Sequence, residues 1–385
     1  MKRRAILGIV LAGSATFAIL GVATVRALTR APATVTVSDA AAFARAIADR
    51  EQAMTVRLAP GYYPSIDIIR KKDDPGPPLT VESADPNSRA VIGELDVANA
   101  AGVTLKHVDF ERRAGQVGSR YIAIFRSAQG ARLISSRFRG PLGGVPQPHE
   151  YGLMLRNSDD VRVEGSEFSG LRYGIGFIGG DRMAIVRNEF RDMQTDGIRG
   201  EGANDLLIAG NVIGDFSPAK GDHADGIQLW TNNQKTVNRR IVIRGNLVTR
   251  GKGAFIQGIF VRDTKSQLPL EDVEIANNLI VGGSFNGIAL MSARNGVIRD
   301  NIVVGYPDQQ SWIRLSANQG TRMTGNRSTR YVQQKSEGIV ESGNSTIRQT
   351  RDARRINALI STWAAGNRDL NRNGRYLREL LAEGR

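Results

Sequence analysis

The sequence contains no cysteine and few aromatic residues. The absence of cysteine excludes disulfide bonds, thiolate catalysis and cysteine-ligated zinc sites. Aromatic residues make up 6% of the 385 residues, and the chain has three histidines. By contrast, 43 residues are glycine and 41% are hydrophobic. This balance indicates a sizeable core of aliphatic strands joined by many tight turns, rather than a helix bundle.

The first residues combine positive charge with one apolar run. Three basic residues precede an apolar stretch from Ala5 to Val25, which is the pattern of an export signal. The stretch is also long enough to cross a bilayer, which takes about 20 residues. Residues 1–27 are therefore either a cleaved signal peptide or an anchor, with inner-membrane attachment through residues 5–25. In both cases we expect the body of the chain to be exported, either periplasmic or secreted.

The excess of positive charge is not concentrated in one segment. The formal net charge of +14 is spread over the N-terminus, the body and an arginine-rich tail. A dense basic stripe of the kind that binds nucleic acid is missing, so nucleic acid is not an expected partner. For an exported basic protein we expect an acidic polysaccharide as the partner. We expect the protein to be a monomer.

Internal repetition is the strongest signal in the sequence. Units of about 22 residues recur, each opening with a residue, a glycine and then alternating aliphatic residues; their openings read YGLMLR, YGIGFI, DGIRGE, DGIQLW, QGIFVR and NGIALM. Each unit continues with a polar turn, a second alternating strand, an asparagine and a third apolar strand. Three short strands per unit form one coil of a parallel β-helix. We therefore predict an all-β fold, a single-stranded right-handed parallel β-helix over residues 35–345.

One asparagine recurs at the same point of successive units, at Asn188, Asn211, Asn246, Asn278, Asn301 and Asn326. Stacked asparagines can hydrogen-bond to one another along the helix axis at the strand spacing of about 4.8 Å. We interpret them as structural.

Both ends of the repeat have a different pattern. Residues from Ala40 onward read as a short amphipathic helix, which would cover the open first coil and prevent edge pairing. Residues 346–385 contain two amphipathic helical segments and many arginines. We expect them to form a basic helical C-terminal cap or docking element.

The helical start, the repeated coils and the asparagine ladder together resemble the pectin-lyase-like β-helix superfamily. Known members include polysaccharide lyases, polygalacturonases, uronate epimerases and phage tailspikes. The resemblance covers about residues 35–345 and implies the fold and a carbohydrate-related role, but it does not select one reaction.

The strand period of two predicts which side chains face outward. The aliphatic residues after each glycine point inward, and the alternate residues point outward. Aligning the units gives a first outward column of Met154, Gly176, Arg199, Gln228, Phe260 and Ala289, and a second of Arg156, Ile178, Glu201, Trp230, Arg262 and Met291. The residues before the glycine, here termed lead residues, form a third column of Tyr151, Tyr173, Asp196, Asp225, Gln257 and Asn286. Polar residues gather in the middle units, which predicts a site there.

Longer loops flank the middle units and would form the walls of a groove. They are expected at Ser217–His223, Thr231–Arg239, Arg250–Ile256 and Asp263–Leu270. His223 ends the first loop two residues before Asp225, so it can act as a base, an acid or a ligand.

The function that these residues favour is a uronate lyase or C5-epimerase. Both reactions remove the proton beside a sugar carboxylate, which requires a base and a cation that neutralises the carboxylate. The catalytic candidates are His223 as base, Arg199 and Arg262 as carboxylate ligands, and Asp196 and Asp225. Further substrate contacts are expected from Gln228, Trp230, Glu201, Tyr173, Gln257, His149 and Lys252.

The superfamily resemblance adds two expectations about the site. Lyases of this kind often use calcium, which Asp196, Glu201 and Asp225 could hold through oxygen ligands; the sequence itself requires no cofactor. Gln147-Pro148-His149-Glu150 resembles in part the Asp-Pro-His-Glu of alginate epimerases, although the first aspartate is missing.

Two other functions stay open. A glycoside hydrolase of the polygalacturonase type would use Asp196 and Asp225, which occupy equivalent places on neighbouring coils. Its usual aspartate pair corresponds here to Ala224-Asp225. A non-catalytic glycan-binding or cell-surface β-helix would need the two aspartates only as turn residues.

Overall fold

The computed structural model describes residues 32–140, 150–232, 234–263 and 268–382. The predicted signal or anchor, residues 1–27, lies outside these ranges, and so does His149. Among the described residues, no helix combines the length and the apolar character needed to span a membrane.

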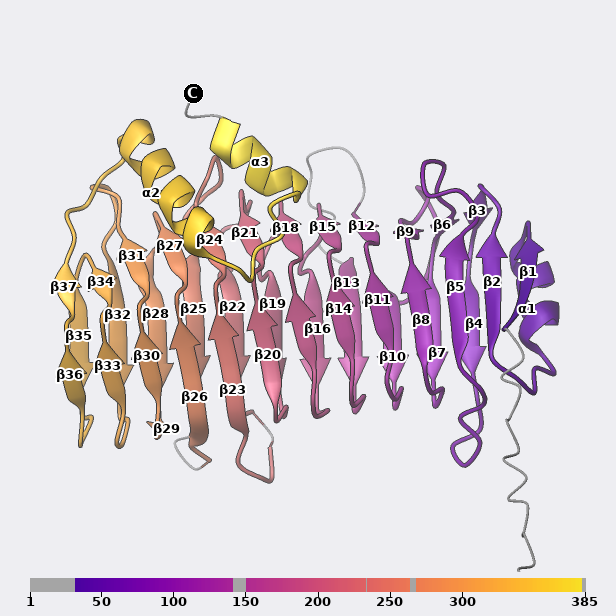
Figure 1. Ribbon diagram of the computed structural model, residues 1–385, viewed down its shortest axis with the longest axis horizontal. Helices are drawn as coiled ribbons and strands as arrows, with labels where there is room; N and C mark the ends of the chain where they lie inside the picture. Colours follow the sequence, from indigo (N-terminus) through magenta and orange to yellow (C-terminus); the bar gives the residue numbers. More distant parts are fainter. Residues whose placement is uncertain (1–31, 141–149, 233, 264–267, 383–385) are drawn as a thin grey trace, which may run out of the picture. The chain divides into compact units, whose positions relative to one another are not determined.

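The described chain forms three parallel sheets, confirming the predicted all-β parallel β-helix (Figure 1). Successive strands of one coil belong to sheets A, B and C in turn, so each coil adds one strand to each sheet. In the described residues, sheet A has 14 strands: β1 (Ala33–Val37), β2 (Met54–Leu58), β5 (Leu79–Ser83), β8 (Val103–Lys106), β11 (Arg132–Ile134), β14 (Arg162–Glu164), β17 (Ala184–Val186), β20 (Leu206–Ala209), β23 (Arg239–Arg244), β26 (Leu270–Ala276), β30 (Val297–Arg299), β33 (Arg322–Thr324), β36 (Val340–Ser342) and, beside β26, β29 (Ala293–Arg294).

Sheets B and C follow the same order along the helix axis. Across the same ranges, sheet B has 12 strands: β3 (Tyr62–Tyr63), β6 (Val91–Ile92), β9 (Asp109–Phe110), β12 (Arg137–Arg139), β15 (Glu167–Ser169), β18 (Glu189–Arg191), β21 (Val212–Gly214), β24 (Leu247–Thr249), β27 (Leu279–Val281), β31 (Ile302–Val304), β34 (Arg327–Ser328) and β37 (Ser345–Thr346). Sheet C has 11 described strands: β4 (Ile66–Ile69), β7 (Leu95–Ala98), β10 (Tyr121–Arg126), β13 (Tyr151–Arg156), β16 (Ile175–Ile178), β19 (Ile198–Glu201), β22 (Asp225–Trp230), β25 (Gln257–Arg262), β28 (Phe285–Met291), β32 (Ser311–Ser316) and β35 (Tyr331–Gln334).

The core consists of stacked side chains that repeat from coil to coil. In sheet B the rings of Phe110, Phe138, Phe168 and Phe190 are stacked, with centroids 4.4 to 4.9 Å apart. The predicted asparagine ladder is present and buried. The side-chain amide of Asn211 donates to Oδ1 of Asn246 at 2.9 Å, and that of Asn246 donates to Oδ1 of Asn278 at 2.9 Å. The stacked asparagines therefore provide hydrogen-bond partners for the buried polar groups of the turn between sheets A and B.

The glycine that opens each repeat faces the packed interior. A Cβ atom on Gly226 would lie 2.8 Å from Cγ1 of Val248 and 2.9 Å from the carbonyl oxygen of Gly258. The equivalent atom on Gly258 would lie 2.1 Å from the carbonyl oxygen of Gly287. Since no side chain fits there, glycine is required at this corner.

The first coil is covered by a helix, as predicted. Helix α1 (Ala40–Ile47) begins at Asp39, whose side chain accepts a hydrogen bond from the Ala42 N–H at 2.7 Å. Such a cap satisfies one of the free N–H groups at the helix start. Phe43 is buried from this helix against the core.

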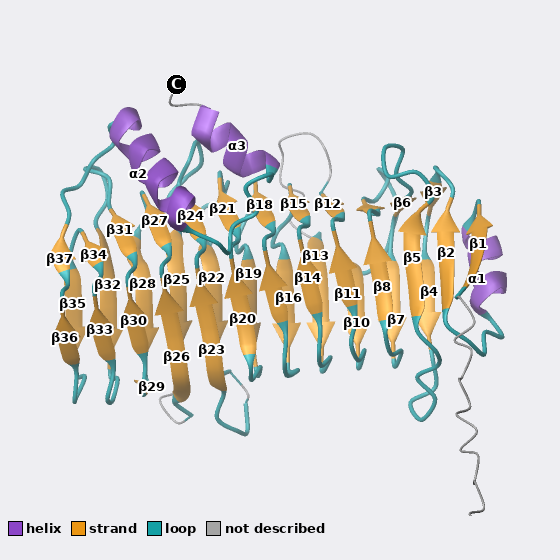
Figure 2. Ribbon diagram, viewed as in Figure 1, coloured by secondary structure: helices purple, strands orange, loops and turns teal. Residues whose placement is uncertain are grey.

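The two C-terminal helices lie along the side of the β-helix rather than over its last coil (Figure 2). Helix α2 (Ala353–Gly366) and helix α3 (Arg375–Ala382) have a buried apolar face each. These faces pack against outward side chains of sheet B in β21, β24 and β27. The tail therefore covers part of sheet B and leaves sheet C open.

Candidate active site on sheet C

A groove of about 520 Å³ lies on the middle coils of sheet C. Its lining includes Arg172, Asp196, Arg199, His223, Gln228, Trp230, Phe260 and Arg262. Six of these eight residues were predicted from the sequence, and Arg172 and Phe260 were not proposed as site residues. The groove is therefore centred where the sequence placed its polar residues.

The outward columns have the register that the sequence predicted. Arg199 is paired with Gln228, and Gln228 with Phe260 on the next strand. In the second column, Glu201 is paired with Trp230 and Trp230 with Arg262. Parallel pairing holds these side chains at the strand spacing of about 4.8 Å, so they form a continuous row on β19, β22 and β25.

His223 and Asp225 form a pair in which only the imidazole reaches solvent. Nδ1 of His223 lies 2.9 Å from Oδ2 of Asp225. The His223 side chain is 57% exposed, whereas that of Asp225 is fully buried. Gln228 donates a second hydrogen bond to the same oxygen of Asp225 at 2.8 Å. The hydrogen bond from His223 to Asp225 raises the pKa of His223, while burial raises the pKa of the Asp225 carboxyl.

Both carboxylate oxygens of Asp196 bind neighbouring groups of the protein. Oδ1 accepts the backbone N–H of Asp225 at 3.1 Å, and Oδ2 lies 3.0 Å from Nη1 of Arg199. The side chain is 1% exposed. Burial, together with the neighbouring charge of Asp225, raises the pKa of Asp196 to about 7. Asp196 therefore acts as a buried anchor for Arg199 and as a link to the next coil.

Arg199 is held over the groove by aromatic rings as well as by Asp196. Its guanidinium carbon lies 4.8 Å from the ring centre of Trp230 and 5.3 Å from that of Tyr173. Cations over aromatic faces are stabilised by the ring quadrupole. Tyr173 in turn stacks on Tyr151 with ring centroids 4.3 Å apart, and the ring of Tyr121 lies tilted against Tyr151 with centroids 5.3 Å apart. An aromatic row thus extends from the groove toward the N-terminal coils.

A second hollow of about 400 Å³ lies on the other side of His223. Gln257, Asn286 and Trp312 line it, together with His223 and Arg314. Gln257 and Asn286 continue the column of lead residues, as predicted. Trp312 was not predicted as a site residue, because its unit begins with SW and lacks the repeated glycine.

Several predicted residues are not brought into the groove. The backbone N–H of Lys252 donates to Oδ1 of Asp215, and Lys252 lines neither hollow. Glu201 lies beside Trp230 in the outward column, where burial raises its pKa, and it also lines neither hollow.

The carboxylates proposed for calcium do not form a ligand cluster. Among the described residues, no group of three or more histidine, cysteine, aspartate or glutamate side chains could hold a metal ion. Asp196 is already bonded through both oxygens, and Oδ2 of Asp225 is bonded to His223 and Gln228. Calcium prefers six to eight oxygen ligands. The described residues therefore do not fit a calcium site at Asp196, Glu201 and Asp225.

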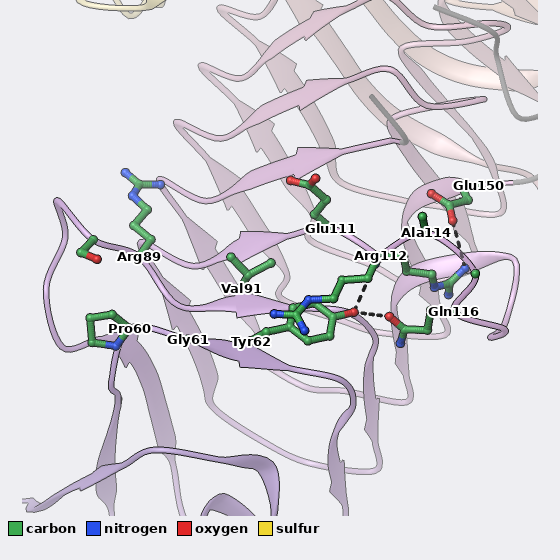
Figure 3. A pocket seen from close by; sticks show the side chains of 13 residues that line it. Pro60, Gly61, Tyr62, Arg89, Val91, Glu111, Arg112, Ala114, Gln116 and Glu150 are labelled. Atoms are coloured by element: carbon green, nitrogen blue, oxygen red, sulfur yellow. Dashed lines mark hydrogen bonds and ion pairs between the residues drawn. The ribbon is translucent and has the colours of Figure 1, made fainter. Parts of the chain in front are cut away.

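A larger hollow of about 870 Å³ lies at the N-terminal coils, around Tyr62 and Arg112 (Figure 3). Arg112 is nearly buried and lies 3.2 Å from Glu94 and 3.8 Å from Glu150. The guanidinium of Arg113 stacks on the Tyr62 ring at 3.9 Å. These charged groups stabilise one another and the loop that carries them. We therefore place the candidate chemistry at His223 rather than in this larger hollow.

Comparisons with known proteins agree with this architecture. A family model described as a right-handed β-helix region matches residues 122–347. A search of curated proteins by sequence gives no match.

Solved structures match the fold at low sequence identity. The surface adhesin PfbA of Streptococcus pneumoniae matches with a TM-score of 0.52 and 13% identity, over 83% of this chain and 82% of that chain. The A-module of the mannuronan C-5 epimerase AlgE6 from Azotobacter vinelandii matches with a TM-score of 0.49 and 12% identity, over 81% of this chain and 94% of that chain. The catalytic domain of a GH87 α-1,3-glucanase matches with a TM-score of 0.48 and 12% identity, over 81% of this chain and 69% of that chain. At 13% identity, the likeness to PfbA shows the fold alone.

Proposed function

This chain belongs to the right-handed β-helix family, and we propose that it is an exported enzyme that cleaves a uronate-containing polysaccharide by β-elimination. The observation that carries the proposal is the exposed imidazole of His223, backed by the buried carboxylate of Asp225 and open to a groove with arginines. A base held in this way can remove a proton from a bound sugar.

The arginines of the groove suit the substrate carboxylate. A proton on the carbon beside a carboxylate becomes removable when cations stabilise the negative charge that develops on the carboxylate oxygens. Arg199 and Arg262 both line the groove near His223. Arg199 is fixed by Asp196 and by two aromatic rings, so little reorganisation is needed when the carboxylate binds.

The proposed reaction transfers one proton and breaks one glycosidic bond. Once the bound sugar has displaced the NH2 group of Gln257, Nε2 of His223 takes the proton from the carbon beside the carboxylate. The electron pair of that C–H bond forms the new carbon–carbon double bond, and the neighbouring C–O bond breaks. The imidazolium then returns its proton to the leaving oxygen. Asp225 keeps the ring oriented and stabilises its positive charge between the two transfers.

Two alternatives are less well supported by the geometry. A C5-epimerase needs a second proton-transfer group on the opposite face of the sugar. Tyr173 is buried, and this burial raises its pKa strongly, so it is poorly suited to that role. A glycosidase would require Asp196 and Asp225 to touch the substrate, but their side chains are 1% and 0% exposed.

The aromatic row supports a long substrate. Tyr121 and Tyr151 are partly exposed on the coils that precede the groove. Rings of this kind contact the apolar faces of sugars. A polysaccharide lying along the axis would place one uronate beside His223 and further sugars over the tyrosines.

The proposal is tested with purified protein and a panel of acidic polysaccharides. A lyase produces an unsaturated uronate, whose conjugated double bond increases the ultraviolet absorbance, together with new chain ends. We expect this increase with at least one polyuronate and its loss in His223→Ala. New reducing ends without the absorbance would indicate hydrolysis, a changed sugar composition without cleavage would indicate epimerisation, and binding alone would indicate a non-catalytic protein; each would refute the proposal.

A further inference from the structure

Four polar side chains form a hydrogen-bonded row across the second hollow. Nε1 of Trp312 donates to Oδ1 of Asn286 at 3.0 Å. Nδ2 of Asn286 donates to Oε1 of Gln257, and Nε2 of Gln257 donates to Nε2 of His223. The row thus runs from β32 through β28 and β25 to the loop before β22, and it ends on the proposed base.

The indole group sets the direction of this row. An indole N–H can donate a hydrogen bond and has no lone pair with which to accept one. Asn286 must therefore turn its oxygen toward Trp312, which leaves its NH2 group facing Gln257. For the same reason Gln257 turns its oxygen toward Asn286 and its NH2 group toward His223. Nε2 of His223 consequently faces a donor and must accept.

The other ring nitrogen faces the opposite kind of partner. Nδ1 of His223 lies 2.9 Å from Oδ2 of Asp225, which also accepts from Gln228. A carboxylate oxygen at this position requires a proton on Nδ1. Both sides of the imidazole therefore select the same neutral tautomer, with the proton on Nδ1 and a lone pair on Nε2.

We propose that Trp312, Asn286 and Gln257 are positioning residues that hold neutral His223 in the tautomer with a proton on Nδ1. Their role in catalysis rests on the proposed function, but the tautomer itself does not. The one lone pair of Nε2 accepts from Gln257 in the free protein, so the substrate must displace this NH2 group before its proton is taken. When Gln257 returns to its place, its NH2 group and the new Nε2–H face each other as two donors. This repulsion favours release of the proton to the leaving oxygen.

The inference is tested by NMR on the full chain labelled with ¹⁵N at its three histidines, without substrate. His223→Gln assigns the signal. Protonated and unprotonated ring nitrogens have distinct ¹⁵N shifts, so the neutral tautomer is read directly. In the unmodified protein we expect one tautomer, with the proton on Nδ1.

Trp312→Phe removes the donor and keeps an aromatic ring beside Phe285. Asn286 and Gln257 can then turn over, so that the oxygen of Gln257 accepts from Nε2–H. Because Asp225 still binds the proton on Nδ1, we expect the neutral tautomer to stay the same and the protonation midpoint of His223 to be higher by about one pH unit, since the imidazolium gains an acceptor at Nε2. Asn286→Leu should act in the same direction, because leucine has no NH2 group to present to Gln257, has nearly the same size and adds no charge.

Trp363→Phe is the matched control. Trp363 lies in helix α2, which covers sheet B, and its indole N–H donates to the carbonyl oxygen of Asn277 at 3.2 Å. This variant should leave the His223 signals unchanged. A proton on Nε2 in the unmodified protein overturns the inference, and so does an unchanged protonation midpoint of His223 in both Trp312→Phe and Asn286→Leu. An Nδ1-protonated His223 in a protein without lyase activity would refute the proposed function and support the inference.

Discussion

The Nδ1 atom of His223 lies 2.9 Å from a carboxylate oxygen of Asp225, and the Asp225 side chain has no exposed surface. An ionisable pair of this kind orients the imidazole and stabilises its charged form. Asp225→Asn keeps the shape but removes the negative charge. We expect the turnover rate on a polyuronate to fall by about 10² to 10⁴.

The measurement is the initial rate of absorbance increase under saturating substrate. Asp205→Asn serves as the control, because Asp205 pairs with Arg240 at the surface outside the groove. It should keep the full rate. A wild-type rate in Asp225→Asn would show that the pair does not take part in the reaction.

The dependence of the reaction on pH follows from the same pair. The base must be neutral, and the hydrogen bond to Asp225 raises the pKa of His223 above its ordinary value of about 6.5. We therefore expect kcat/KM to increase with pH and to reach half its maximum above that value. In Asp225→Asn the half-point should move to lower pH, because the negative partner is lost. An unchanged half-point would assign the titration to another group.

Arg199 is expected to act through the shape of its guanidinium as well as its charge. Arg199→Lys keeps a positive charge but loses the planar fork that binds carboxylates and stacks on Trp230. We expect kcat/KM to fall by about 10-fold to 100-fold, which corresponds to the loss of one charge-assisted hydrogen bond or slightly more. Arg182→Lys, on the surface beside Asp160, should have no effect. Equal loss in both variants would point to a general effect on stability.

Removal of divalent cations should leave the reaction intact. Asp196 and Asp225 are engaged with Arg199, His223 and Gln228, and the described residues contain no cluster of carboxylates that could hold calcium. Activity measured after dialysis against a chelator should equal the activity with added calcium. A strict requirement for calcium would mean that these side chains rearrange to bind it.

The asparagine ladder should contribute strongly to stability. Asn246 is buried and bonds to both Asn211 and Asn278. Asn246→Ala leaves several buried backbone and side-chain groups without partners, each of which costs about 1–3 kcal/mol. We expect the free energy of unfolding to fall by about 3 kcal/mol or more, measured by urea denaturation. Asn344→Ala, at the partly exposed last rung, should cost clearly less.

Much of the fold could be predicted because every coil repeats the same spacing. The glycine, the inward aliphatic residues and the asparagine fix three points of each unit, so the outward columns could be aligned before the structure was known. The observed pairing of Arg199 with Gln228 and of Glu201 with Trp230 has this register. The position of helices α2 and α3 could not be predicted, because an amphipathic face does not specify the surface that it covers.

The contacts within the site could be predicted less well from the sequence. Asp196 and Asp225 directly precede the repeated glycines, where the chain turns into the strand of sheet C. The alternation of inward and outward side chains along a strand does not apply at this turn, so their burial could not be predicted. Trp312 was missed because its coil lacks the glycine and because the pairing of β28 with β32 shifts register between Asn286 and Ile288. A short repeat therefore predicts which residues are neighbours, while hydrogen bonds depend on local deviations from the repeat.

The glycine column also allows the surface of sheet C to differ from one end of the helix axis to the other. Since the glycines make the core contacts at the corner, the lead residues can differ in type from coil to coil. From β13 to β28 they change from tyrosine to aspartate and then to amides, at Tyr151, Tyr173, Asp196, Asp225, Gln257 and Asn286. Because Asp196 and Asp225 are buried, a polymer lying on this surface would meet the tyrosine ring of Tyr151, then the imidazole of His223 and then the amide of Asn286, in one fixed order. The two directions of a polysaccharide chain are therefore not equivalent to this protein.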